Sequence, residues 1–522
     1  MPQSREIPWR DAVNNEELPP VPDAIAYPEQ ELSDEDFSSV FEEAKVSGLL
    51  VKRPSPLLLA DQICSRFFPV TFKGQLYLFN PNTHLYYEDT GTVKQWVRTI
   101  LTKAENRDEF TLPPAQKWDS TVRDVHALVS YSRVLEGKVY PFNCYSGYPA
   151  ENCVISFADD GTVSAEPYTH LMKFTRKTPV VYNPSADTRP VVSVLQSWMP
   201  GHDDSGNPLY EWLLQIPAQA IIQSFPGITP FKKAYLMLGK PNAGKSSYYN
   251  LLQLFFGEKN CGTFMLHEFS DNFIVAELPG KFLNNGDDLP FIRIEASNKF
   301  KALTGKRYMT VNPKFGKPYE AQITAVQTFS ANYPPELAST LITDDGWWDR
   351  WVVLVFAGVF EKDPTWEKRT FTRVFLEGFF LLVIREVQKI IRNSCRLCMV
   401  QDKEQVRDTW VCNLKLLHEF IDRYVEKTDD NEHYIAKEDF LATLQEWGQD
   451  YMEVPVGMQR SEMMKQLPLS PRSLTSALSL EGIYPKQIAD KTRPYFNITW
   501  KKSIINFLWV HKSRSKCGPV KK

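Results

Sequence analysis

Between residues 206 and 360, short apolar runs alternate with longer segments of helical spacing. Four runs are predicted as strands, namely "FKKAYLMLG" (231–239), "KFLNNGDD" (281–288), "QITAVQTFSAN" (322–332) and "RWVVLVF" (350–356). The segment "KSSYYNLLQLFFG" predicts a helix that Gly257 closes. Apolar strands joined by crossover helices are typical of a parallel sheet buried on both faces. We therefore predict an α/β domain over residues 206–360.

The pattern is different over residues 51–205. "PSPLLLADQICSRFF" and "TVKQWVRTILTKA" predict helices. "VTFKGQLYLFNPNTHLYYED" alternates around an Asn-Pro-Asn turn, and "NCVISFADDGTVSAE" alternates around Asp-Asp-Gly, so each predicts a β-hairpin. This mixture predicts a separate α+β N-terminal domain.

Residues 361–412 are predicted to be a helical lid or linker, 413–502 a small domain, and 503–522 a basic tail. Within the small domain, "SPRSLTSALSLEGIYPKQI" has helical spacing and "ADKTRPYFNITWKK" reads as a hairpin. A helix followed by a hairpin predicts a winged-helix fold. Arg472 on the helix, with Lys491 and Arg493 on the wing, would contact DNA phosphates. A lid or protein-contact domain is the alternative.

Charge is unevenly spread along the chain. Residues 1–50 hold twelve acidic and three basic residues, whereas the whole chain has a formal net charge of -3. We expect 1–50 to be a disordered acidic leader. The remainder is mildly basic, which weakly favours a nucleic-acid partner.

The most apolar stretch is "VFLEGFFLLVIREV" (374–387). It is shorter than the ~20 residues that a membrane span needs and contains three charged residues. We predict a buried helix and no membrane partner. Eight cysteines in 522 residues do not suggest a disulfide scaffold. We therefore expect a soluble, intracellular protein.

The stretch "GKPNAGKSS" fits the phosphate-loop pattern G-x-x-x-x-G-K-[ST], between a predicted strand and a predicted helix. Backbone N–H groups at such a helix N-terminus bind phosphate. Lys245 would contact the β- and γ-phosphates of ATP, and the Ser246 hydroxyl would bind Mg²⁺. The predicted nucleotide-binding residues are Gly239, Lys240, Pro241, Asn242, Ala243, Gly244, Lys245, Ser246 and Ser247.

Three further positions suggest ATP hydrolysis. Asp287 and Asp288 end a predicted strand that we expect beside the loop strand, with Asp287 binding Mg²⁺ and Asp288 polarising water. A plain turn is the alternative for "NNGDDLP". Asn332 ends the next strand and could contact the γ-phosphate or the water. Arg350 could act on a neighbouring subunit's nucleotide; a salt bridge to Asp349 or Asp345 is the alternative.

The order of these elements resembles the superfamily 3 helicases, most closely the phage, plasmid and poxvirus-type primase-helicases. "GKPNAGKSS" resembles their Walker A motif and "KFLNNGDDLP" their Walker B motif. "FKALTGKRYMTVNPKFGKPYEAQ" resembles motif B′, "TFSANYPPEL" motif C, and "GWWDRWVVLVF" the following arginine element. The resemblance implies an AAA+-like core that forms a homo-hexameric ring with ATP between subunits. The chain has Asp-Asp where many relatives carry Glu, and no primase domain is visible.

A ring helicase needs basic side chains in its channel, because phosphates supply most of the affinity for DNA. A hairpin within "TVNPKFGKPYEAQ" would bring Lys314 and Lys317 to phosphates and Phe315 to a base. Lys306 and Arg307 would line the same channel. A solvent-exposed hairpin is the alternative.

Together these features predict an ATP- and Mg²⁺-dependent DNA helicase that acts in replication of a virus, phage or plasmid, in the host cytoplasm or at the replication site. Single-stranded and forked DNA would be its partners, with a separate primase or polymerase. The main alternative is a replication initiator that melts an origin without processive unwinding. A small-molecule kinase is a weaker alternative, because it needs neither the hairpin nor the arginine.

Overall fold

The structure of the 522-residue chain is a computed structural model. The structure describes residues 20, 23, 33, 37–46, 49–114, 117–136, 140–203, 206–290, 292–295, 297–305, 308–314, 318–413, 415–427, 435–450, 474, 478, 483, 485–486, 495–496 and 498–500.

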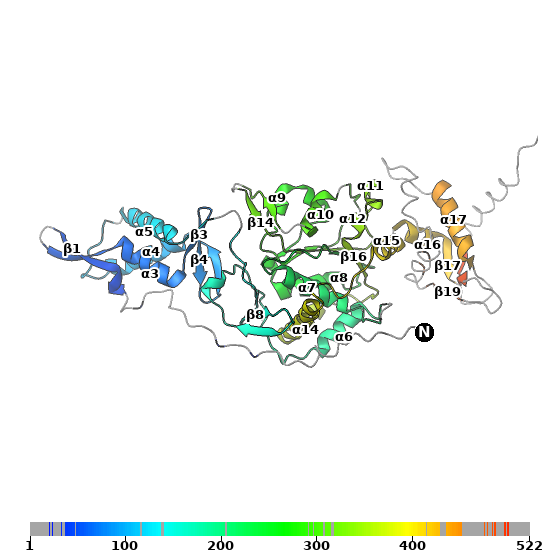
Figure 1. Ribbon diagram of the computed structural model, residues 1–522, viewed down its shortest axis with the longest axis horizontal. Coiled ribbons are helices and arrows are strands. Elements are labelled where there is room, and N and C mark those ends of the chain that lie inside the picture. Colours follow the sequence, from blue (N-terminus) through cyan, green and yellow to red (C-terminus); the bar gives the residue numbers. More distant parts are fainter. Residues whose placement is uncertain are drawn as a thin grey trace, which may run out of the picture.

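The central part is built on a five-stranded parallel sheet (Figure 1). In spatial order its strands are β11 (Cys261–Gly262), β12 (Leu283–Gly286), β15 (Val326–Ala331), β10 (Ala234–Leu238) and β16 (Trp351–Val355). The four predicted strands all form, and β11 is an addition at the edge. All neighbouring pairs are parallel, as the continuous apolar runs predict. The α/β prediction is confirmed.

Helices cover both faces of this sheet, and the strand side chains alternate between two cores. Tyr235 and Met237 of β10 join one core, whereas Ala234, Leu236 and Leu238 join the other. Neighbouring side chains of a strand point to opposite faces, so both sides of β10 must be covered by apolar groups.

The first core contains α6 (Arg189–Trp198), α7 (Glu211–Gln223), α8 (Lys245–Phe256) and α14 (Arg373–Arg392). The second core contains elements from the opposite face. These are η5 (Leu266–Ser270), α9 (Asn272–Val275), α10 (Asn298–Gly305), α11 (Ser339–Ile342), α12 (Asp345–Trp348) and α15 (Lys403–Cys412). Four short elements remain, namely η4 (Glu258–Asn260), the antiparallel pair β13 (Met309–Val311) and β14 (Tyr319–Ala321), and α13 (Trp366–Thr370).

The N-terminal part contains both predicted helices and both predicted hairpins. Helices α3 (Pro56–Phe67), α4 (Thr92–Glu105) and α5 (Trp118–Ser132) pack in one core, and η1 (Ser38–Val40) joins them. The strand order β5 (Leu85–Glu88), β4 (Gln75–Asn80), β3 (Val70–Phe72), β6 (Val134–Leu135) extends the first hairpin to four strands. A separate hairpin is formed by β1 (Phe41–Val46) and β2 (Leu49–Pro54).

The second hairpin consists of β8 (Val154–Phe157) and β9 (Val163–Glu166), with β7 (Tyr148–Pro149) pairing on β8, and η3 (His170–Met172) follows. Side chains of β7, β8 and α6 share the first core with α7, α8 and α14. This segment therefore packs with the central sheet, although it precedes the predicted boundary at 205.

Helix α14 contains the most apolar stretch of the sequence, and its side chains are buried in the first core. No helix among the described residues is long and apolar enough to cross a membrane. The buried-helix prediction is therefore confirmed.

The C-terminal part has a core of its own. Its elements are α16 (Lys415–Tyr424), β17 (Val425–Lys427), β18 (Ile435–Ala436), α17 (Lys437–Asp450), β19 (Pro485–Lys486), β20 (Tyr495–Phe496) and β21 (Ile498–Trp500). β19 pairs with β20, and β21 pairs with β17. Figure 1 shows this part at the opposite end of the molecule from α3, α4 and α5.

Candidate active site at the carboxyl edge of the sheet

The glycine-rich loop joins β10 to α8 in a conformation that requires its glycines. Gly244 has a φ of 96°, and a Cβ added there would lie 2.5 Å from the Trp198 ring. Asn242 also adopts a left-handed φ of 63°. The N–H groups in the first turn of any α-helix have no partner within the helix. Gly244, the residue before α8, has no side chain that could accept from them. The loop thus presents backbone donors at a helix N-terminus, which favours anions.

Lys245 is the first residue of α8, and its ammonium group lies inside the loop. Its Nζ donates to the carbonyl oxygens of Gly239 at 2.6 Å and Lys240 at 3.0 Å, and to Asn332 Oδ1 at 3.1 Å. Burial lowers the pKa of Lys245, and the charges of Asp287 and Asp288 partly oppose this. The ammonium group is therefore held among acceptors and carboxylates at the carboxyl edge of the sheet.

Asp287 and Asp288 follow β12 directly, as predicted, but the expected neighbour is wrong. β12 pairs with β11 and β15, so β15 separates it from β10. The carboxylates nevertheless act on Lys245, because parallel strands bring their carboxyl ends to one edge. β15 also positions the acidic pair. The Ser330 hydroxyl donates to Asp287 Oδ1 and accepts the backbone N–H of Asp288 at 3.0 Å.

Ser330 was missed by the sequence reasoning. It is one of three polar residues in β15, with Gln327 and Thr328, so no local pattern singled it out. Ser330 is buried, whereas Asn332, just past the end of β15, is exposed to solvent. The Asn332 side chain accepts a hydrogen bond from Lys245. The predicted juxtaposition of Lys245, the acidic pair and Asn332 is present in the structure.

A cavity of about 690 Å³ opens on the other side of the loop. Asn242, Gly244, Ser246 and Ser247 form one wall. The other walls come from α6, including Trp198, and from residues 360–367, including Phe360 and Trp366. These residues were not predicted, since they lie far from the loop in sequence and belong to no motif. Aromatic walls with a few polar groups are typical of ligand pockets.

Ser246 and Asp287 were predicted to bind Mg²⁺. Ser246 follows Lys245 in α8, and its side chain is exposed beside the cavity. Within the described ranges, no group of three or more His, Cys, Asp or Glu side chains could hold a metal by itself. Magnesium in nucleotide sites keeps several waters and uses one or two carboxylates plus phosphates. The hydroxyl and carboxylate donors here fit that chemistry.

Arg350 lies at the opposite edge of the sheet. It precedes β16, whose first residue pairs with Ala234 at the start of β10. A five-residue strand separates the two edges by about 15 Å. Arg350 Nε donates to Thr304 Oγ1 at 3.1 Å, and Nη1 donates to the Gly346 carbonyl. In the described part of the chain no carboxylate lies within ion-pair distance of Arg350, so the alternative of a direct salt bridge to Asp349 or Asp345 is wrong. The charges of Asp344 and Asp349 still act on Arg350, and Asp345 pairs with Lys403.

Most of the predicted DNA-binding residues lie outside the described residues. These are Lys306, Arg307, Phe315, Lys317, Arg472, Lys491 and Arg493. Lys314 is described: it is exposed and lies between β13 and β14, which pair as the predicted hairpin. The β19–β20 pair brackets the predicted wing residues.

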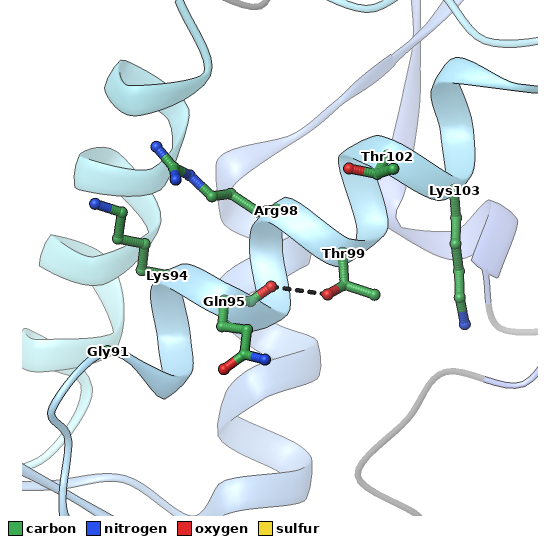
Figure 2. Close-up of a pocket in the computed structure, with 7 residues that line it drawn as sticks. All are labelled: Gly91, Lys94, Gln95, Arg98, Thr99, Thr102 and Lys103. Atoms are coloured by element: carbon green, nitrogen blue, oxygen red, sulfur yellow. Dashed lines mark hydrogen bonds between the residues drawn. The ribbon is translucent and has the colours of Figure 1, made fainter.

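Figure 2 shows a second hollow, of about 450 Å³, along the outer face of α4. Lys94 and Arg98 point the same way from this helix, and Thr99 Oγ1 donates to the Gln95 carbonyl at 2.9 Å. Arg98 is paired with Asp119. All lining residues come from α4 and its N-terminus. We interpret this surface as a solvated helix face, not as an active site.

Comparisons with known proteins show what the chain is similar to. Residues 237–350 match a family of unknown function, DUF5906, and this segment contains the loop, the acidic pair, Asn332 and Arg350. No curated protein gives a significant match.

Solved structures of the NrS-1 C-terminal region have low similarity to the chain. An A-form apo structure is 11% identical with a TM-score of 0.40, covering 83% of this chain and 96% of that one. Another apo structure is 13% identical with a TM-score of 0.41, covering 85% and 99%. Values this low carry no conclusion about activity.

Proposed function

We propose that the protein is an ATP-dependent DNA helicase with a P-loop core of the AAA+ type. The observation that carries this proposal is the meeting of Lys245, the Asp287–Asp288 pair and Asn332 at one edge of the parallel sheet. A phosphate-binding loop, a carboxylate pair and a polar strand tip are what ATP hydrolysis requires.

In this proposal, the triphosphate replaces the loop carbonyls and Asn332 as the partner of Lys245. The free N–H groups of α8 bind the phosphates, and Ser246 and Asp287 hold Mg²⁺. Asp288, whose side chain is exposed, orients the attacking water, with Asn332 beside the γ-phosphate. Magnesium supplies charge neutralisation between the β- and γ-phosphates.

The cavity beside the loop would take the nucleoside. Phe360 and Trp366 line the cavity and could pack against a base, whereas Trp198 is buried behind them; the Glu361 carboxylate could accept from an amino group or ribose hydroxyls. Its volume of about 690 Å³ is within the range of ligand pockets, roughly 300–1,000 Å³.

The position of Arg350 favours the assembly of several subunits into a ring. It stands at the amino edge of the sheet, about 15 Å from its own loop by strand length, so it cannot contact nucleotide bound there. No ion pair explains it among the described residues. A head-to-tail ring of six subunits would bring it to the nucleotide of a neighbour, and the β13–β14 hairpin with Lys314 would face the DNA in the channel.

The test is DNA-stimulated ATP hydrolysis by the full chain. Lys245→Ala should lower the rate at least about 100-fold, because it removes the charge that faces the transferred phosphate. Lys259→Ala is the matched control, since Lys259 lies in η4 just after α8 and its side chain is exposed, and it should stay near wild type. Equal rates for Lys245→Ala and wild type would remove the loop from the proposal.

A further inference from the structure

Arg176 is a buried charged side chain that the proposed function does not use. It lies at the amino edge of the sheet, away from the loop. Its guanidinium group stacks on the Phe282 ring at 3.9 Å, just before β12. Its Nη2 donates to Thr324 Oγ1 at 3.3 Å, two residues before β15. Only 5% of its surface is exposed.

No carboxylate among the described residues pairs with Arg176. Its Nη1 is buried without a hydrogen-bond partner. Burial lowers the pKa of Arg176 to about 10, so it remains charged at neutral pH. A buried charge with no counter-charge is costly, and proteins normally pair such groups or bind an ion there.

Arg176 lines a small cavity at the base of the β13–β14 hairpin. The cavity measures about 60 Å³, and its walls include Tyr140, Cys144, Tyr308 and Gln322. Lys173 adds a second positive charge nearby. Burial raises the pKa of the Cys144 thiol, and the charges of Lys173 and Arg176 partly oppose that rise. The cavity is thus positive and too small for a base, but large enough for one tetrahedral anion.

We propose that this cavity is a phosphate-binding site, in which the Arg176 guanidinium provides the counter-charge for one phosphate group. A planar guanidinium binds phosphate through two parallel N–H bonds, and the unpaired Nη1 and the weakly bonded Nη2 are such a fork. The phosphate belongs either to a nucleic-acid strand that passes the hairpin or to a free ion. Only the first source rests on the proposed function.

The experiment measures the rate at which Cys144 is alkylated, by peptide mass mapping. It uses the Lys245→Ala protein, in which the phosphate loop no longer offers a competing phosphate site. Cys144 is an exposed residue whose thiol is partly buried at the cavity wall, so a bound phosphate should shield it. Inorganic phosphate should slow its alkylation at least about threefold relative to sodium chloride at equal ionic strength. Cys395, also exposed, is the internal control and should not respond.

Adding Arg176→Gln should abolish the protection, since glutamine is polar but carries no charge. Should that variant not fold, Arg176→Lys serves instead, and it should need at least about tenfold more phosphate because it lacks the fork. An abasic single-stranded oligonucleotide distinguishes the two sources. Protection at far lower concentration than phosphate assigns the site to a strand, and protection by phosphate alone assigns it to a free ion.

The proposal is overturned if neither ligand protects Cys144, or if protection survives unchanged in the Arg176 variant. Neither result bears on ATP hydrolysis, which this experiment does not involve.

Discussion

At the scale of single residues, the burial of Lys245 leads to the clearest prediction. It is buried among two carbonyl oxygens and an amide oxygen, and that burial lowers its pKa. A lowered pKa means that the amine loses its proton at a pH below its ordinary value of 10.5. The neutral form gives no charge to a phosphate.

We therefore predict that in wild-type protein nucleotide affinity falls with rising alkaline pH before the ordinary lysine value of 10.5 is reached. ATP is already fully ionised over this range, so its own titration does not contribute. Titration calorimetry at several pH values measures the effect, and whatever affinity Lys245→Arg retains should not change with pH. A flat profile for the wild type would show that burial does not perturb this lysine.

How far residues could be predicted depends on the kind of signal they carry. Lys245, Asp287 and Asn332 stand at motif positions or strand ends, where the pattern itself points to chemistry. Ser330, Trp198 and Arg176 act through contacts between distant segments. No local pattern encodes those contacts, so the sequence left these three unnoticed.

At the scale of elements, periodicity predicted the strands and helices but not the strand order. Alternation and apolar runs set which faces are buried, and these were correct for β10, β12, β15 and β16. Which strands are neighbours depends on crossovers between them, and here β15 lies between β10 and β12. That insertion is why Ser330, rather than a residue of β10, holds the acidic pair.

Ser330→Ala should therefore lower ATP hydrolysis about tenfold while ATP affinity stays near wild type. Without the hydroxyl, the Asp287 carboxylate and the Asp288 backbone N–H lose their common hydrogen-bond partner. The position of the two carboxylates should therefore change more than the affinity for ATP. Steady-state kinetics with a separate nucleotide titration measures both. If affinity fell with the rate, Ser330 would instead be supporting the loop.

The β13–β14 hairpin is the described element that we predict to contact single-stranded DNA. Lys314→Ala should weaken single-stranded DNA binding and reduce the slope of log affinity against log salt concentration by about one. Lys103→Ala, on the exposed face of α4 in Figure 2, is the matched surface control and should change neither quantity. An unchanged slope for Lys314→Ala would place the DNA elsewhere.

At the scale of the whole molecule, the proposed functional residues lie at two opposite edges of the central sheet. The carboxyl edge holds the proposed nucleotide site, and the amino edge holds Arg350 and Arg176. The fold class was predictable, because an alternation of buried strands and helices has few solutions. The packing of β7, β8 and α6 with the central sheet was not, since it depends on long-range contacts between segments of ordinary composition.

Assembly gives a test that uses both edges. Arg350→Ala and Asp288→Asn should each be inactive alone, yet an equal mixture should recover about a quarter of the active sites, since a site needs Asp288 from one subunit and Arg350 from the next. ATP hydrolysis of premixed subunits measures this recovery. No recovery at any ratio would contradict action between subunits.

The central claim is that ATP hydrolysis at the carboxyl edge drives strand separation. The most direct measurement is strand displacement on a forked DNA substrate with ATP and Mg²⁺, using the full chain at the concentration where it forms its largest assembly. We predict displacement that requires ATP hydrolysis and is lost in Lys245→Ala. A protein that binds DNA and hydrolyses ATP but displaces no strand would contradict the claim and favour a replication initiator.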